Sequence, residues 1–239
     1  MEKLGILDWG IGGLGLYQSL KAKGELSIAY FSDAGYTPYG KVDRAVLRQR
    51  VHACIEFLKQ QDCTLVAIAC NSAGSTIMDL EHPNIVKSGI ELIKTSNFKS
   101  VGVIGGIGTV ESELYLCDSS KMITQNVAQK MSAHIEAGTQ HSETAQKDLR
   151  DILKPLNQVD ALLLACTHYP AIRDLISNIL NNNCHIMDPS IHLATNLLSV
   201  HQFSKGSDHI FTTGNVNQMK NAAKLAFNVE LKSINKAEL

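Results

Sequence analysis

The chain has 239 residues, which is enough for one large or two small domains with a buried core. Hydrophobic residues make up 44% and charged residues 19%, as in ordinary globular proteins, and a formal net charge of −1 without a basic block predicts no nucleic-acid partner. No apolar run approaches the roughly 18 residues of a membrane helix. Six cysteines in a chain of this length indicate a reducing, cytoplasmic setting rather than a disulfide scaffold. The lack of a C-x-x-C pair argues against a thiolate zinc site.

Predicted strands and helices alternate along the whole chain. The first apolar strand, 4–7, runs into Asp8 and the glycine-rich turn Gly10-Ile11-Gly12-Gly13. The other predicted strands are 27–31, 65–70, 85–93, 100–108 (which includes a glycine turn), 123–127, 161–166, 185–187 and 209–212. Apolar spacing predicts helices over 14–23 and 42–60, from about 72 onward with Asn71 or Ser72 as N-cap, and over 110–117, 140–153, 171–180, 191–202 and 217–227. This alternation is typical of an α/β fold with mainly parallel sheets.

Two features of the sequence occur twice. A strand entering a glycine turn begins at Gly5 and again at Gly102, and a strand ends in a cysteine at Cys70 and again at Cys166. The two pairs are separated by nearly the same distance. We therefore predict two pseudosymmetric α/β domains that face each other across a central cleft. One comprises residues 1–96 plus 208–239 and the other residues 97–207, with the last strand and helix folding back onto the first half.

The two strand-end cysteines, Cys70 and Cys166, suggest a specific chemistry. The carboxyl ends of parallel strands form the edge of the sheet where ligands bind. A thiolate can remove a proton from one face of a carbon while a thiol delivers a proton to the opposite face, which is racemisation or epimerisation without a cofactor. Asp8 and His168 could tune the two sulfurs, and donors at Asn71 and neighbouring helix N-termini could hold a carboxylate. The remaining four cysteines are interpreted as core residues: Cys54, Cys63, Cys117 and Cys184.

Six segments together resemble a known family. They are Asp8 with its Gly-x-Gly-Gly turn, Asp33 with Pro38-Tyr39-Gly40, Cys70-Asn71-Ser72, Gly102-Val103-Ile104-Gly105 with Thr109, Glu136-Ala137-Gly138, and Cys166-Thr167-His168-Tyr169-Pro170. In this order they are similar to the motifs of glutamate racemases and of the wider aspartate/glutamate racemase superfamily. The resemblance runs from Leu4 to about Gly214.

The resemblance implies an isomerase that interconverts L- and D-glutamate and supplies D-glutamate for peptidoglycan. It implies a cytoplasmic enzyme with a small amino-acid substrate and no cofactor, and it allows a homodimer. By the same resemblance, the catalytic residues are the two acid/base thiols Cys70 and Cys166, assisted by Asp8, His168 and Glu136. The implied substrate-binding residues are Trp9, Pro38, Tyr39, Gly40, Asn71, Ser72, Thr109 and Thr167.

The sequence departs from the family at Trp9, where glutamate racemases usually carry a serine that contacts the substrate. Loss of one hydrogen bond to a charged group costs about 1.5–3 kcal/mol, so an inward Trp9 would favour aspartate or another small amino acid. Two further interpretations are a non-catalytic metabolite-binding member of the fold and a cysteine hydrolase, although the hydrolase leaves the second strand-end cysteine unexplained. The glycine-rich turn could also suggest a dinucleotide loop, but we expect no NAD.

Overall fold

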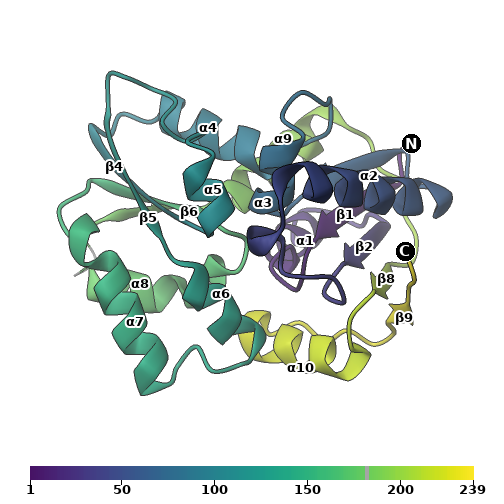
Figure 1. Ribbon diagram of the computed structural model, residues 1–239. Coiled ribbons are helices and arrows are strands. Elements are labelled where there is room, and N and C mark those ends of the chain that lie inside the picture. Colours follow the sequence, from purple (N-terminus) through teal and green to yellow (C-terminus); the bar gives the residue numbers. More distant parts are fainter. Residues whose placement is uncertain (181–182) are drawn as a thin grey trace.

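A computed structural model of the protein describes residues 1–180 and 183–239, which form two β-sheets with helices packed against them (Figure 1). The strand order is β3-β1-β2-β8-β9 in the first sheet and β5-β4-β6-β7 in the second, and all these neighbours pair in parallel. The strands of the first sheet are β1 (Leu4–Asp8), β2 (Ile28–Ser32), β3 (Leu65–Ile68), β8 (His209–Thr212) and β9 (Asn235–Lys236). Those of the second are β4 (Ser100–Gly105), β5 (Met122–Val127), β6 (Ala161–Ala165) and β7 (His185–Met187). The predicted α/β fold with two parallel sheets is confirmed.

Helices follow most of the strands. The α-helices are α1 (Leu14–Lys21), α2 (Arg44–Gln60), α3 (Asn71–Thr76), α4 (Ile85–Thr95), α5 (Ile107–Glu111), α6 (Gln129–Glu136), α7 (Glu143–Leu153), α8 (Arg173–Ile179), α9 (Pro189–Val200) and α10 (Val216–Phe227). Short 3-10 turns are η1 (Tyr39–Lys41), η2 (Lys154–Leu156) and η3 (Tyr169–Ile172). Because the strands are covered by helices, a strand such as β6 is buried along its whole length, which explains its uninterrupted apolar sequence.

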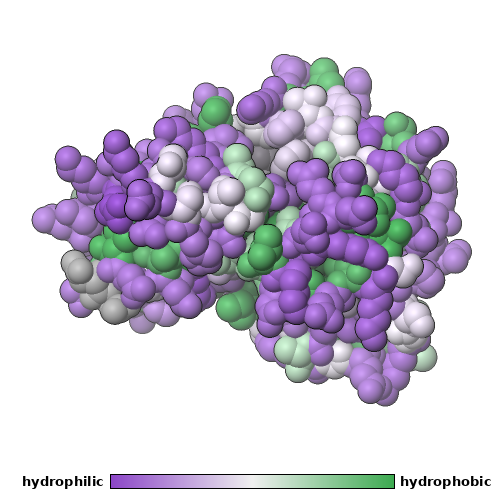
Figure 2. All heavy atoms as spheres, turned by 90° about the horizontal axis from the view of Figure 1, so that it is seen from below, coloured by the Kyte–Doolittle hydropathy of each residue, from purple (hydrophilic) through white to green (hydrophobic). Residues whose placement is uncertain are grey.

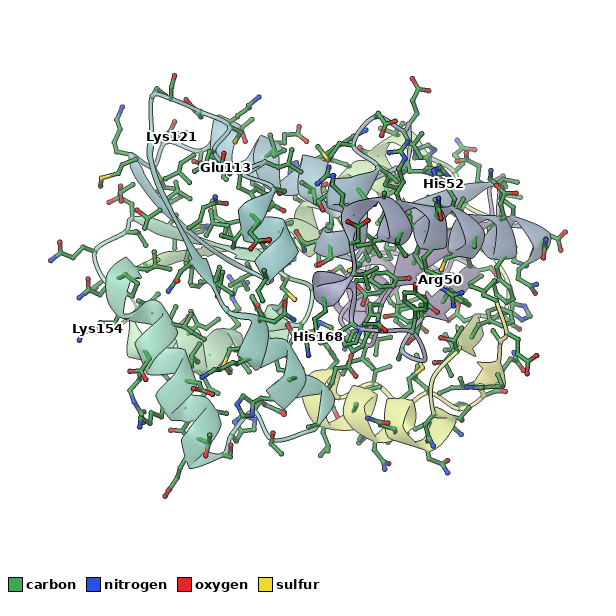
Figure 3. The ribbon with its side chains drawn as sticks, in the orientation of Figure 1. Arg50, His52, Glu113, Lys121, Lys154 and His168 are labelled. Atoms are coloured by element: carbon green, nitrogen blue, oxygen red, sulfur yellow. The ribbon has the colours of Figure 1, made fainter. Side chains whose placement is uncertain are left out.

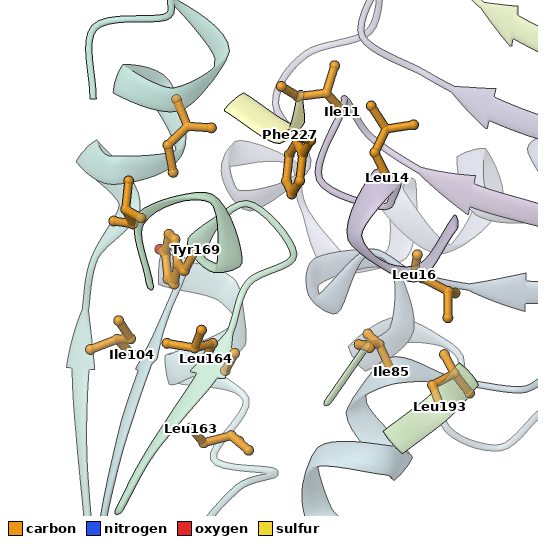
Figure 4. Close-up of a cluster of buried hydrophobic side chains, with 14 of the residues drawn as sticks. Ile11, Leu14, Leu16, Ile85, Ile104, Leu163, Leu164, Tyr169, Leu193 and Phe227 are labelled. Atoms are coloured by element: carbon orange, nitrogen blue, oxygen red, sulfur yellow. The ribbon is translucent and has the colours of Figure 1, made fainter. Parts of the chain in front are cut away.

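Most of the buried apolar side chains belong to one hydrophobic cluster that includes residues of both sheets. Figure 4 shows Ile104 and Leu164 from the second sheet on one side, and Leu16 with Leu193 on the other. A smaller cluster lies between the first sheet and α2. The two sheets are therefore held by continuous apolar packing, and the edge where their strands end remains available for polar groups.

The end of the chain returns to the first sheet. β8 pairs with β2, with Ala29 opposite His209, and β9 adds to the outer side of β8. Helix α9 packs against both α1 and α4. The sheets thus combine segments from the expected parts of the sequence, while the domain boundaries near residues 96 and 208 stay a prediction.

Two predicted elements differ from the structure, one helix was not predicted, and one helix has a different N-cap. The predicted strand 85–93 is wrong, because Asn84 caps a helix there by accepting a hydrogen bond of 2.9 Å from Val86 N, and the apolar run follows helical spacing. The predicted helix 110–117 is also wrong in extent, since α5 ends at Glu111. Helix α6 was not predicted, and neither Asn71 nor Ser72 is the N-cap of α3, because that position is Cys70.

The surface of the molecule is largely polar. Figure 2 shows a mainly hydrophilic face with smaller hydrophobic groups in several separate places. Over the residues that the structure describes, none of the helices combines the length and the apolar character needed to cross a membrane.

Candidate active site

Cysteines from both sheets meet in one small cavity. Cys70 follows β3 and precedes α3, and Cys166 follows β6, so each lies at the carboxyl end of a parallel strand. We call this cavity the thiol pocket; its volume is about 40 Å³. Its lining residues are Trp9, Pro38, Tyr39, Gly40, Cys70, Asn71, Ser72, Gly106, Thr109, Gln129, Ser132, Ala165, Cys166, Thr167 and His168. Figure 3 places His168 between the two halves of the molecule.

All the residues that the sequence suggested for substrate binding line the thiol pocket, as do the predicted catalytic residues Cys70, Cys166 and His168. The other two predicted catalytic residues, Asp8 and Glu136, lie behind this wall. Each of them contacts a residue of the pocket wall. Asp8 accepts a hydrogen bond from Thr167 of the other half, and Glu136 pairs with His168. The structure therefore brings the whole predicted set together.

Cys166 has polar side chains within reach of its sulfur. Its Sγ lies 3.4 Å from Oγ of Ser132 and 3.6 Å from Nδ1 of His168. On the far side of the imidazole, Nε2 of His168 lies 2.6 Å from Oε1 of Glu136. Burial lowers the pKa of His168, but the hydrogen bonds to Cys166 and Glu136 outweigh it and raise this pKa well above its ordinary value. The imidazole is therefore held in its protonated form beside the sulfur.

Glu136 is the anionic partner in this arrangement. Burial raises the pKa of its carboxyl. The hydrogen bond and the charge of His168, together with the N–H of Ile11, lower this pKa by more, so the net shift is downward. The N–H of Ile11 donates to Oε1 at 2.9 Å. Glu136 on α6 is thus an ionised carboxylate that orients His168 and also contacts the glycine turn of the first half.

Cys70 has a different environment. Burial and the nearby charge of Asp8 raise the pKa of its thiol, and the backbone N–H groups of Ala73 and Trp9 offset this only in part. Both carboxylate oxygens of Asp8 are already engaged: Oδ1 accepts from Gly10 N at 2.9 Å, and Oδ2 accepts from Oγ1 of Thr167 at 2.9 Å. Burial raises the pKa of Asp8 itself. Cys70 is therefore held as a protonated thiol.

The glycine-rich turn after β1 allows the two halves to approach closely. Gly10, Gly12 and Gly15 do have the spacing of a dinucleotide-binding loop. However, a Cβ on Gly10 would collide with the Glu136 carboxylate, and a Cβ on Gly12 would collide with Thr167 and His168. Protein side chains thus occupy the space in front of the turn where a pyrophosphate would lie in a dinucleotide-binding protein.

Two buried donors at the thiol pocket lack a partner within the described part of the chain. They are Nδ2 of Asn71 and Oγ1 of Thr109, and both residues are almost fully buried. Unpaired buried polar atoms cost free energy, so such atoms facing a cavity indicate a place for a polar ligand. Because Asn71 and Thr109 come from opposite halves, the ligand would be held from both sides.

Trp9 forms part of the pocket wall. Its ring centroid lies 6.5 Å from that of His168, and its indole Nε1–H donates to the backbone oxygen of Tyr36 at 3.1 Å. Trp9 also lines a neighbouring cavity of about 690 Å³, which shares Pro38, Gln129 and Ser132 with the thiol pocket. The aromatic face is therefore available to a ligand, whereas the indole donor is used by the protein.

The sequence did not identify four pocket residues: Gly106, Gln129, Ser132 and Ala165. Gln129 and Ser132 lie on α6, and recognition of that helix would have placed Ser132 one turn before Glu136. Among residues 1–180 and 183–239, no cluster of three or more His, Cys, Asp or Glu side chains is arranged to hold a metal ion.

Comparison with known proteins shows similarity along almost the whole chain. No protein-family profile matches it. Glutamate racemase 2 of Caldanaerobacter subterraneus subsp. tengcongensis is 28% identical, and the match covers 97% of this chain and 95% of that protein. A glutamate racemase isoform of Bacillus anthracis has the same fold, with a TM-score of 0.90, 24% identity and coverage of 100% and 98%. Glutamate racemase of Francisella tularensis, solved with D-glutamate, gives a TM-score of 0.89, 23% identity and coverage of 99% and 97%.

Proposed function

We propose that this chain, a relative of glutamate racemases, is an amino-acid racemase that interconverts L- and D-glutamate without a cofactor. The observation that carries the proposal is the thiol pocket, in which strand-end cysteines from the two sheets line one cavity with different proton-transfer partners. A binding protein would have no use for two such thiols. The similarity over nearly the full length of a glutamate racemase supports the same reaction.

In this mechanism, Cys70 and Cys166 act on opposite faces of the α-carbon. One sulfur, as a thiolate, takes the α-proton and becomes a thiol, and the electron pair of the C–H bond remains on the substrate carbanion. The other sulfur, as a thiol, gives its proton to the opposite face and becomes a thiolate. No redox change occurs, and the reverse reaction uses the same two groups in exchanged roles. The protonated His168 beside Cys166 stabilises the thiolate form at that sulfur.

The substrate carboxylate would bind the unpaired donors of Asn71 and Thr109, with Ser72 and Thr167 nearby. The thiol pocket has room for about three water molecules, since each needs roughly 10–15 Å³ of such volume. Binding of glutamate therefore widens the pocket, and the neighbouring cavity of about 690 Å³ offers a route for entry beside Trp9. Pro38, Tyr39 and Gly40 complete the wall on that side.

The biological role that fits this reaction is supply of D-glutamate for peptidoglycan in the cytoplasm. We propose a homodimer as the assembly, in line with the resemblance to the family, and light scattering of the purified protein tests this directly.

The deciding experiment is proton NMR of the purified protein in D₂O with L- and D-glutamate, followed by L- and D-aspartate. We expect loss of the α-proton signal of glutamate together with inversion, measured by chiral chromatography. Exchange of aspartate alone would retain the two-thiol mechanism and overturn the substrate. A lack of exchange with every amino acid in a broad panel would overturn the racemase itself.

A further inference from the structure

Tyr115 lies outside the thiol pocket but contacts a residue that lines it. Its side chain is fully buried, and its hydroxyl donates a hydrogen bond of 2.6 Å to Oδ1 of Asn71. Tyr115 follows α5 on the side of the second sheet, whereas Asn71 is the first residue of α3, directly after Cys70. This hydrogen bond therefore crosses between the two halves and ends on a group beside a reacting sulfur.

The hydroxyl of Tyr115 fixes the direction in which the Asn71 amide points. A buried phenol needs an acceptor for its proton, and among the described residues that acceptor is Oδ1 of Asn71. Burial raises the pKa of Tyr115 above its ordinary value, so the proton stays on the phenol. With Oδ1 engaged, Nδ2 is the amide atom left to face the pocket, and within the described chain it has no partner. Asn71 therefore offers a donor and not an acceptor.

Helix α4 supports the tyrosine ring from behind. Gly89 lies in the middle of α4, where glycine is less favourable than alanine. A Cβ at this position would lie 2.7 Å from Cε1 of Tyr115, closer than real contacts allow, and 3.0 Å from its hydroxyl oxygen. The ring thus fills the space that a side chain at 89 would need and lies directly against α4.

We propose that Tyr115 is a positioning residue that holds the Asn71 amide with its N–H₂ toward the pocket, so that Asn71 binds a substrate carboxylate. The identity of the ligand rests on the proposed function, whereas the orientation of the amide does not. Without the Tyr115 hydroxyl the amide can rotate and present its oxygen to the carboxylate. Binding then weakens, while proton transfer between the sulfurs and the α-carbon is little affected.

The kinetic test compares Tyr115→Phe, Asn71→Ala and the double variant in both reaction directions. We expect Tyr115→Phe to raise KM roughly fivefold for both enantiomers, with less than a twofold change in kcat. Asn71→Ala should raise KM more, and adding Tyr115→Phe to it should have no further effect, because the two residues act as one unit. Tyr17→Phe is the matched control: it removes a hydroxyl that donates to Asp208 at 2.7 Å, outside the pocket, and should leave both constants unchanged.

An unchanged KM in Tyr115→Phe, or effects that simply add in the double variant, would overturn the proposal, as would a lower melting temperature with normal KM.

A second readout needs no substrate. The side-chain amide signals of Asn71 in a ¹⁵N-labelled sample, assigned by their loss in Asn71→Ala, should move in Tyr115→Phe and not in Tyr17→Phe. If the wild-type protein racemises nothing, the proposed function fails, and this NMR comparison still tests the contact of the Tyr115 hydroxyl with the Asn71 amide on which the proposal depends; unmoved signals would reject it.

Discussion

Cys70 and Cys166 occupy equivalent strand ends in the two halves, yet their neighbours differ. Cys166 is contacted by the side chains of Ser132 and His168, with Glu136 behind the imidazole. Cys70 is more deeply buried, faces backbone N–H groups, and lies near a carboxylate, Asp8, whose oxygens are engaged elsewhere.

The two sulfurs therefore have different neighbours for proton transfer. A protonated imidazole lies next to Cys166, whereas burial raises the pKa of the Cys70 thiol. The pseudosymmetry of the fold does not extend to these neighbours, and the variants below probe each side.

The largest effect is expected from replacement of either sulfur. Cys70→Ser and Cys166→Ser should each lower the racemisation rate by at least about 10³-fold, because a hydroxyl is a far weaker acid than a thiol and both groups act in every turnover. Chiral chromatography measures the rate, and circular dichroism checks the fold. Cys184→Ser, at a cysteine that does not line the thiol pocket, is the control and should be fully active. Normal activity in either pocket variant would refute the two-thiol mechanism.

The next largest effect concerns the Cys166 side alone. His168→Asn removes the cationic neighbour of Cys166, and kcat/KM should fall by about 10²-fold in both directions, since the two enantiomers are equal in energy. The asymmetry should appear in the α-deuterium isotope effect. It should rise for the enantiomer whose α-hydrogen faces Cys166 and fall for the other, because the step at Cys166 becomes limiting. Equal isotope effects for both enantiomers would argue that the two sides are equivalent.

A smaller effect is expected on stability from Glu136→Gln. The lowered pKa of Glu136 means that its stabilisation is present above its ordinary pKa of 4.5 and is lost as the pH falls through the lowered value. The raised pKa of His168 means that its contribution is complete below 6.5 and is lost as the pH rises through the raised value. The pair should therefore contribute most between pH 4.5 and 6.5, where Glu136→Gln should cost about 2 kcal/mol.

Urea unfolding across a pH series measures this contribution. Glu2→Gln provides the control, since Glu2 pairs with His201 at 2.7 Å on the surface, where solvent screens the interaction. A cost of Glu136→Gln that does not decrease outside the stated pH window would show that the pair is not ionised as described.

The sequence predicted the parts of the site that depend on strand ends. A buried parallel strand places the residues that follow it at the carboxyl edge of the sheet, where ligands bind. The apolar runs before Cys70 and Cys166 were therefore enough to predict both as site residues. Asp8 and His168 followed from their positions beside these strand ends, and the resemblance to the family added Glu136. The chemical difference between the two sulfurs was not predictable, because it arises from contacts between residues far apart in the chain, such as Asp8 with Thr167.

The failures have identifiable causes. The sequence predicts a strand over 85–93, whereas the hydrophobic side chains of this segment lie on one face of a helix that begins after the Asn84 cap. Helix α6 is short, with a largely polar sequence, and it packs against α7, α10 and η3; it was not predicted, and Ser132 was missed with it. Tertiary packing decided both elements.

The smallest effect is expected at Trp9, in the wall of the thiol pocket. Its ring lines the thiol pocket while its indole N–H is bound to Tyr36 O, so Trp9→Ser should both widen the pocket and add a free hydroxyl. Glutamate is one methylene longer than aspartate, and we expect its kcat/KM to rise roughly fivefold relative to that of aspartate. Trp9→Phe is the matched control, because it keeps an aromatic wall and should leave the ratio unchanged. An unaltered ratio in Trp9→Ser would mean that the Trp9 ring bounds the pocket without touching the substrate, so that other residues of the wall select between glutamate and aspartate.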